Sequence, residues 1–246
     1  MGNDRKEKVI SVSKVTAIVL AAGQGKRMNS SVAKQFLMLQ DRPVVYYSLK
    51  AFEESIADEI ILVTGEGQVE FCKKEIVDLY RINKVKQIVE GGKERYDSVY
   101  RALQSVLTAD YVLIHDGARP FITVNLINRV IDQVKECQAC LIGMPVKETI
   151  KMVAEDGTVQ TTPRRNILWA AQTPQAFAFP SIKAAYEALY LEENREGLAI
   201  TDDAMVYEAY GKLPVKMLEG DYNNIKLTTP EDLILAEQML KRIRSH

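Results

Sequence analysis

The chain alternates short apolar runs with longer segments in which apolar residues recur at helical spacing. The apolar runs are rich in β-branched residues, which favours strands, and they occupy residues 15–20, 59–63, 85–89, 111–114 and 139–143. The segments with helical spacing occupy about residues 44–54, 67–81, 96–107 and 124–137. Strands that alternate with helices predict an α/β fold with a mainly parallel, twisted sheet and helices on both faces. No internal repeat or low-complexity linker interrupts the pattern, so we expect one domain over residues 15–246.

One segment departs from this alternation and predicts a β-hairpin. Between Pro145 and Pro163 the sequence reads as two short strands around Glu155-Asp156-Gly157, and Asp-Gly is a strong turn signal. An isolated two-stranded hairpin is only marginally stable in water, so it needs a surface to pack on. We therefore expect a protruding arm at about residues 145–165 that packs on a second copy of the chain, which makes a homodimer.

The C-terminal part predicts a lysine on a strand, followed by a helix. Lys226 is expected in a short strand whose neighbours Ile225 and Leu227 face the core; the alternative, an ordinary exposed lysine, is disfavoured by the other residues that suit an anion. Thr229 then suits the N-cap of the last helix, with Pro230 at its first position and acidic residues in its first turn.

Composition and charge narrow the range of functions. The chain has 246 residues, enough for one large domain, and a net charge of −1, which gives no overall basic field to attract nucleic acid. No apolar stretch approaches the roughly 20 residues of a membrane helix, so we expect no membrane partner. The polar tail at residues 1–14 lacks the apolar core of a signal peptide.

Cys137 and Cys140 could form a zinc or redox pair, but Cys140 opens an apolar run. Reduced, structural cysteines are therefore favoured, which fits a cytoplasmic protein.

A glycine loop follows the first predicted strand. Gly23 and Gly25 allow a tight turn that brings backbone N–H groups close to an anionic ligand. Lys26, Arg27 and Lys34 add positive charge to the same region. An ordinary strand-to-helix turn would also use glycines, but the added cations favour a site for a nucleoside triphosphate.

The spacing of this loop differs from the two best-known glycine motifs. The phosphate loop of many NTPases needs a Gly-Lys-Ser/Thr ending, which Gly25-Lys26-Arg27 does not supply. The dinucleotide motif has its third glycine position occupied here by Met28, which disfavours a dehydrogenase. The acidic residue that a dehydrogenase needs after the next strand has an ambiguous candidate in Glu66.

Two further clusters follow predicted strands, where α/β sheets bind ligands. Gly91 and Gly92 would let the backbone approach a flat ligand, and Ser98 would lie in the first turn of the next helix. Taken alone, this cluster fits an ordinary glycine turn before an acidic helix start equally well. Asp116 is well placed to hold Mg²⁺ against phosphates, because hard cations prefer carboxylate oxygens. The alternatives for Asp116 are a helix cap or a local salt bridge with Arg119.

The motifs together resemble one enzyme family over about residues 15–240. The matching pieces are Ala21-Ala22-Gly23, Gly25, Arg27-Met28, Lys34-Gln35-Phe36, Gly91-Gly92, Glu94-Arg95, Ser98, the run 115–120, the run 145–149, Leu168-Trp169, the run 172–175, the run 201–204 and Asn224-Ile225-Lys226. In these pieces the chain is similar to the 2-C-methyl-D-erythritol 4-phosphate cytidylyltransferases of the non-mevalonate isoprenoid pathway. The resemblance implies a Rossmann-like nucleotidyltransferase domain that transfers a cytidylyl group from CTP to a polyol phosphate.

The resemblance also implies residue roles. It implies that CTP is held by Ala21, Ala22, Gly23, Gly25, Gly92, Ser98 and Asp116. Asp116 would also bind Mg²⁺ or another divalent cation. The implied catalytic residues are Arg27, Lys34, Arg165 and Lys226, the first two at the α-phosphate of CTP. The implied ligands of the acceptor substrate are Thr149, Arg165, Thr173, Lys226 and Arg119, with Thr149 and Arg165 supplied by the partner's arm.

Alternatives remain within and outside this class. A ribitol-5-phosphate cytidylyltransferase of teichoic-acid synthesis shares the CTP loop and several motifs, but Trp169 and the run 201–204 favour the methylerythritol enzyme. A non-catalytic nucleotide-binding regulator is disfavoured because Arg27, Lys34, Asp116 and Lys226 are all retained. Position 93 is Lys93, where some relatives carry an acidic residue, so we assign Lys93 no role. Arg164 competes with Arg165, which is preferred because it directly precedes the stretch that leads to Trp169.

Overall fold

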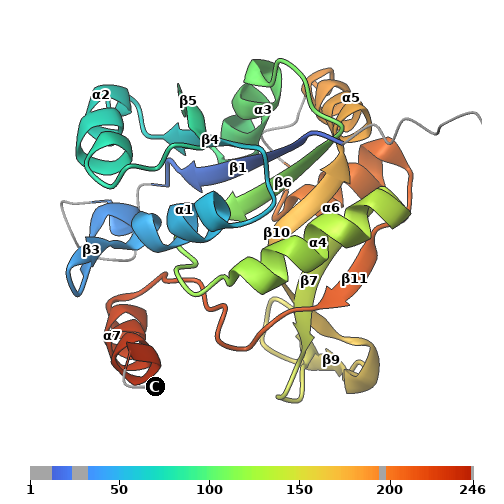
Figure 1. The fold of residues 1–246 in the computed structure, drawn as a ribbon. Helices are drawn as coiled ribbons and strands as arrows, with labels where there is room; N and C mark the ends of the chain where they lie inside the picture. The colour runs from blue at the N-terminus through green and yellow to red at the C-terminus, as the bar shows by residue number, and fades with distance from the viewer. Residues whose placement is uncertain (1–12, 24–32, 194–197, 245–246) are drawn as a thin grey trace, which may run out of the picture.

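A seven-stranded sheet forms the centre of the molecule in the computed structural model, which describes residues 13–23, 33–193 and 198–244. Helices cover both faces of this sheet (Figure 1). In spatial order its strands are β11 (Lys216–Glu219), β7 (Ala139–Pro145), β10 (Trp169–Ala178), β6 (Tyr111–Asp116), β1 (Val15–Ala21), β4 (Glu59–Thr64) and β5 (Val85–Glu90). The five strands predicted from apolar runs are all present.

The sheet is mainly parallel, as predicted. β1 pairs in parallel with β4 and β6, β4 with β5, and β11 with β7. β10 is the exception, because it runs antiparallel between β6 and β7. The apolar pattern did not predict β10, since the polar run Gln172-Thr173-Pro174-Gln175 interrupts it. It did not predict β11 either, whose residues are exposed or half-buried at the sheet edge.

The helices divide between the two faces. The helical elements are α1 (Val44–Glu54), α2 (Val69–Cys72) with a π-helical continuation (Lys73–Asp78), α3 (Arg95–Ser105), α4 (Val124–Cys137), α5 (Phe179–Tyr190), α6 (Asp203–Val206) with a π-helical continuation (Tyr207–Gly211), and α7 (Pro230–Arg244). One core cluster joins α1, α2 and α4 to the sheet, and a second joins α3, α5 and α6 to its other face. The four predicted helical segments are confirmed, whereas α5 was not predicted.

A third, smaller core fixes the C-terminal segment. Leu39 of β2 (Met38–Leu39) packs with Leu227 and with Leu240 of α7. The prediction of a strand at Lys226 was wrong, because the segment does not join a sheet. Its Leu227 N–H instead donates to the Ala118 carbonyl oxygen at 2.8 Å, beside the end of β6. Leu227 is buried as expected, so the segment is held by its apolar side chain and places Lys226 beside the sheet.

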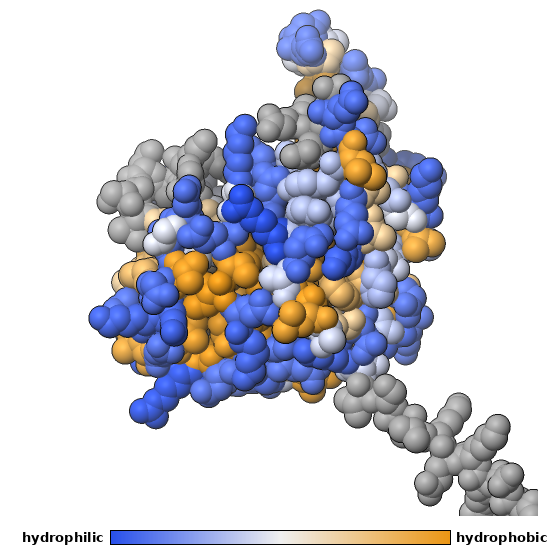
Figure 2. All heavy atoms as spheres, turned by 90° about the horizontal axis from the view of Figure 1, so that it is seen from above, coloured by the Kyte–Doolittle hydropathy of each residue, from blue (hydrophilic) through white to orange (hydrophobic). Residues whose placement is uncertain are grey.

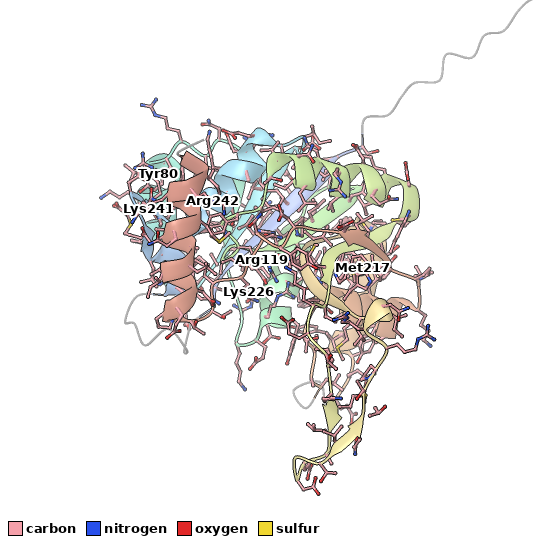
Figure 3. All side chains as sticks on the ribbon, turned by 90° about the horizontal axis from the view of Figure 1, so that it is seen from below. Tyr80, Arg119, Met217, Lys226, Lys241 and Arg242 are labelled. Atoms are coloured by element: carbon pink, nitrogen blue, oxygen red, sulfur yellow. The ribbon has the colours of Figure 1, made fainter. Side chains whose placement is uncertain are left out.

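The predicted hairpin is present and projects from the body of the molecule (Figures 1 and 3). β8 (Met152–Val153) pairs antiparallel with β9 (Val159–Thr161), and Gly157 adopts a φ of 83° in the turn between them. Both strands are exposed along their length.

Figure 2 shows one face of the molecule that is mostly hydrophilic, with hydrophobic residues gathered left of its centre. In the parts of the chain that the structure describes, no helix is both long and apolar enough to span a membrane.

Candidate active site

A cleft of about 950 Å³ opens where β1, β4, β5 and β6 end. Its position agrees with the rule that α/β sheets bind ligands beyond the carboxyl ends of their strands. Among the residues that line it are Ala22, Gly23, Lys34, Gln35, Gly91, Gly92, Ser98, Arg95, Asp116 and Lys226. Most of the predicted nucleotide-site residues therefore meet in one place.

The first wall of the cleft comes from the segments on both sides of the glycine loop. Ala21 ends β1 and is buried, while Ala22 and Gly23 line the opening. Gln35 is buried, and its side-chain amide donates to the Ala21 carbonyl oxygen, which holds the returning chain against β1. Lys34, the residue before Gln35, lines the cleft. The predicted residues Gly25 and Arg27 lie outside the described part of the chain.

The second wall is the tight turn between β5 and α3. A Cβ atom on Gly91 would lie 2.5 Å from the Ala22 Cβ, and one on Gly92 would lie 2.2 Å from the Asp97 Cβ. The turn therefore requires glycine at both positions. Ser98 accepts a hydrogen bond from the Gly92 N–H at 3.1 Å, which ties the turn to the first turn of α3. Bare backbone faces the cleft here, as a flat base or ribose would require.

Asp116 lies at the centre of the charged part of the cleft. Lys226 Nζ lies 2.7 Å from Asp116 Oδ2, and Arg95 Nε lies 3.2 Å from Asp116 Oδ1. Burial alone would raise the pKa of Asp116, but the positive charges of Arg95 and Lys226 outweigh it and hold that pKa well below its ordinary value. The carboxylate is thus ionised throughout the neutral range.

Two other predicted residues, Thr173 and Arg119, make hydrogen bonds that hold Asp116 and the segment of Lys226 in place. Thr173 is buried, and its hydroxyl accepts a hydrogen bond from the Asp116 N–H at 3.0 Å and contacts His115 Nδ1 at 3.1 Å. Burial lowers the pKa of His115 to about 3, so its ring is neutral near pH 7. Arg119 donates to the Asn224 carbonyl oxygen at 2.7 Å, two residues before Lys226. Figure 3 shows Arg119 and Lys226 next to each other. These hydrogen bonds therefore fix the backbone on which Asp116 and Lys226 are carried.

An ion pair between Arg95 and Asp203 lies beside Asp116 and was not predicted from the sequence. Arg95 donates to both carboxylate oxygens of Asp203, at 2.9 and 2.7 Å, and Asp203 is fully buried. Tyr186 donates a further hydrogen bond to Asp203 at 2.6 Å. Arg95 and Asp203 both occur in motifs that carry the family resemblance. That shared occurrence was the only signal in the sequence, because their pairing joins residues far apart along the chain.

The two predicted residues of the arm do not reach the cleft of their own chain. Thr149 and Arg165 are exposed and are absent from the lining. Arg165 donates to the Lys147 carbonyl oxygen at 2.9 Å, and the Lys147 ammonium lies 3.6 Å from the centre of the Tyr222 ring. These contacts connect the base of the arm to the segment that carries Lys226.

Asp116 is the candidate metal ligand of the site, because it is the cleft carboxylate that lies beside Arg95 and Lys226. Among the residues that the structure describes, no cluster of three or more His, Cys, Asp or Glu side chains could enclose a metal ion. Mg²⁺ commonly binds through one or two carboxylates together with substrate phosphates, rather than in a cage made only of protein. Asp116 Oδ2, at the edge of a cleft large enough for a nucleotide, fits that mode of binding.

Comparisons with known proteins agree with the geometry. The family model described as 2-C-methyl-D-erythritol 4-phosphate cytidylyltransferase matches residues 15–242. Proteins of that name from Lachnoclostridium phytofermentans and Alkaliphilus oremlandii are 50% and 48% identical to the chain. The alignments cover 94% and 95% of the chain and 97% and 98% of these relatives.

Solved structures give the same result. The 4-diphosphocytidyl-2C-methyl-D-erythritol synthase from Anaerococcus prevotii superposes with a TM-score of 0.80 at 30% identity, covering 93% of this chain and 96% of that one. The 2-C-methyl-D-erythritol 4-phosphate cytidylyltransferase from Thermus thermophilus gives 0.72 at 28% identity, covering 91% and 98%. The family model and the relatives both span nearly the full chain. The chain therefore belongs to the 2-C-methyl-D-erythritol 4-phosphate cytidylyltransferase family.

Proposed function

We propose that the chain transfers a cytidylyl group from CTP to 2-C-methyl-D-erythritol 4-phosphate, with release of pyrophosphate. The product is 4-diphosphocytidyl-2-C-methyl-D-erythritol, a step of isoprenoid biosynthesis. The observation that carries the proposal is the cleft in which Lys34, the glycine turn at Gly91-Gly92 and the Asp116–Lys226 ion pair come together. This combination suits a base and ribose at one end and phosphates at the other.

The chemistry requires charge neutralisation more than proton transfer. The phosphate monoester of the acceptor is largely a dianion at neutral pH, since its second pKa is about 6. It can therefore attack the α-phosphorus of CTP without a general base, as the P–O bond to pyrophosphate breaks. Two polyanions must meet, and preorganised cations stabilise the transition state. His115, neutral and buried, has no part in proton transfer in this scheme.

We assign roles to the cleft residues, and to Arg27 from the family resemblance, accordingly. Lys34 and Arg27 neutralise the α-phosphate, and Lys226 neutralises the acceptor phosphate. The backbone at Ala22 and Gly92, with Ser98, holds the cytidine. Asp116 would hold Mg²⁺, and the ion would supply positive charge that stabilises the phosphates and the pyrophosphate leaving group.

We also propose that the active unit is a homodimer in which arms are exchanged. The arm exposes Met152, Val153 and Val159 to solvent, which is costly for a monomer. Thr149 and Arg165 lie on the arm but away from the cleft of the same chain. In a two-fold dimer each arm would bring these residues to the partner's acceptor site.

We place the reaction in the cytoplasm, since the free thiols of Cys72 and Cys140 in the core fit a reducing compartment.

Pyrophosphate release tests the proposed reaction. Purified protein is incubated with CTP, Mg²⁺ and either 2-C-methyl-D-erythritol 4-phosphate or ribitol 5-phosphate, with ATP, GTP and UTP as nucleotide controls. We expect release with CTP and the methylerythritol phosphate. Faster release with ribitol 5-phosphate would assign the chain to teichoic-acid synthesis instead. CTP binding without any release would make it a non-catalytic nucleotide-binding protein.

A further inference from the structure

We infer that Arg95 is a positioning residue, which orients the Asp116 carboxylate so that its Oδ2 atom serves the cleft. The inference rests on the proposed function, because it assigns a task within the same site. No role for Arg95 follows from its position in the sequence alone. The role emerges from three contacts that one guanidinium group makes in two directions.

The first direction is toward Asp203. The two terminal nitrogens of Arg95 meet the two oxygens of Asp203, at 2.9 and 2.7 Å. A guanidinium is planar and rigid, so a two-point contact with a carboxylate fixes the orientation of the whole group. The third nitrogen, Nε, then points to Asp116 Oδ1 at 3.2 Å. A lysine could not make both connections with one fixed geometry.

Asp203 is itself held firmly in place. Its side chain is fully buried, and Tyr186 of α5 donates to Oδ1 at 2.6 Å. Its backbone N–H donates to the Gln175 side-chain oxygen at 3.1 Å, which attaches the start of α6 to β10. Arg95 is therefore held by residues of α5 and α6, and its contact with Asp116 Oδ1 restricts the orientation of that carboxylate.

The two oxygens of Asp116 have different surroundings. Both partners of Asp116 line the cleft, but Arg95, on the Oδ1 side, is 26% exposed and Lys226, on the Oδ2 side, is 37% exposed. Arg95 is also bound at two points to the buried Asp203, whereas the ion pair with Asp116 holds Lys226 at one point. Oδ2 is consequently the oxygen of Asp116 that would be available to a divalent cation. Arg95 would continue to hold Oδ1, and with it the orientation of the carboxylate.

A change to lysine tests this role. We expect Arg95→Lys to weaken the binding of Mn²⁺ in the presence of CTP by about tenfold or more. That is the lower end of the loss seen when a partner that orients a metal ligand is removed. The Mg²⁺ concentration needed for half-maximal pyrophosphate release should rise by a similar factor, while binding of metal-free CTP changes little. Mn²⁺ binding is followed by electron paramagnetic resonance and needs no acceptor substrate.

A matched control separates positioning from folding. Arg129→Lys makes the same change in α4, where the Arg129 guanidinium contacts the Glu219 carbonyl oxygen away from the cleft. It should leave Mn²⁺ binding and the Mg²⁺ requirement as in the original protein. Thermal unfolding is measured for all variants. A folded Arg95→Lys protein with unchanged Mn²⁺ affinity would overturn the inference.

A second variant decides the matter if Arg95→Lys does not fold. Tyr186→Phe removes one hydrogen bond to Asp203 and leaves both ion pairs of Arg95 in place. We expect a smaller loss of Mn²⁺ affinity, about two- to fivefold, and in that case unchanged affinity would overturn the inference. Absence of CTP-dependent pyrophosphate release from the unmodified protein would instead contradict the proposed function. The two failures are therefore distinguishable.

Discussion

Lys226 Nζ lies 2.7 Å from Asp116 Oδ2, and this ion pair joins the end of β6 to the segment that precedes α7. The two residues are far apart in the sequence and are brought together by the small core around Leu227. The pair places a negative and a positive group at the same point of the cleft. In the proposed function these two groups bind a divalent cation and a phosphate respectively, and their adjacency would bring the two ligands together.

The first prediction concerns the metal. Asp116→Asn removes the charge that attracts a divalent cation, so turnover at fixed Mg²⁺ should fall about 10²-fold or more. The Mg²⁺ requirement should rise, whereas metal-free CTP should bind nearly as before. Titration of Mg²⁺ against pyrophosphate release provides the measurement. A variant with the original Mg²⁺ requirement would show that Asp116 is only structural.

The second prediction concerns stability and pH. The pKa of Asp116 is held below its ordinary value of about 4, so its ionised form stabilises the fold at pH values above about 4. As the pH falls below 4, the carboxylate is protonated in the unfolded chain before it is protonated in the folded protein, so this contribution is progressively lost. The original protein should therefore be more stable than Asp116→Asn at pH 7, and the difference should shrink by pH 3. Urea unfolding at both pH values measures it. A difference that stays constant would contradict the depressed pKa.

The third prediction separates catalysis by Lys226 from stability. Lys226→Ala should lower kcat by about 10²–10³-fold, because one preorganised contact to the transition state is lost. Because the side chain is 37% exposed, the melting temperature should change by only a few degrees. Lys241→Ala in α7 removes an exposed lysine outside the cleft and serves as the control. Equal turnover in the two variants would exclude a catalytic role for Lys226.

The fourth prediction concerns the glycine turn. Gly92→Ala places a Cβ atom 2.2 Å from the Asp97 Cβ, so the turn between β5 and α3 must move. We expect the KM for CTP to rise about tenfold, with a smaller change in the KM for the acceptor, because the turn faces the nucleotide. Steady-state kinetics with each substrate varied in turn measure both. An unchanged KM for CTP would place the nucleotide elsewhere in the cleft.

The fifth prediction concerns the arm. Lys34→Ala and Arg165→Ala should each abolish most activity, and mixing the two chains should restore it if the arms are exchanged. Each heterodimer would contain one site with both residues intact, so random pairing returns up to about a quarter of the original activity. The mixture is assayed after subunit exchange is verified by mass spectrometry. A mixture as inactive as its parents, despite verified heterodimers, would reject shared sites.

The sequence by itself determined most of the fold and the outline of the site. The apolar runs predicted five strands, because buried parallel strands leave continuous β-branched segments. The Asp156-Gly157 pair predicted the hairpin turn, since Gly157 adopts the positive φ that such a turn requires. The motifs also predicted that Lys34, Gly92, Ser98, Asp116 and Lys226 would gather in one cleft, where the structure places them.

Only the tertiary structure decided how these groups are held. β10 was hidden because Gln172, Thr173 and Gln175 occupy buried positions and hydrogen-bond to distant partners, which a hydrophobic pattern cannot register. The strand predicted at Lys226 failed for a related reason, since one apolar anchor, Leu227, replaces a ladder of backbone hydrogen bonds. The pairing of Arg95 with Asp203 likewise depends on the packing of α3 against α5 and α6. Local patterns specify which element forms, whereas the partner of a buried charge is chosen by the fold that surrounds it.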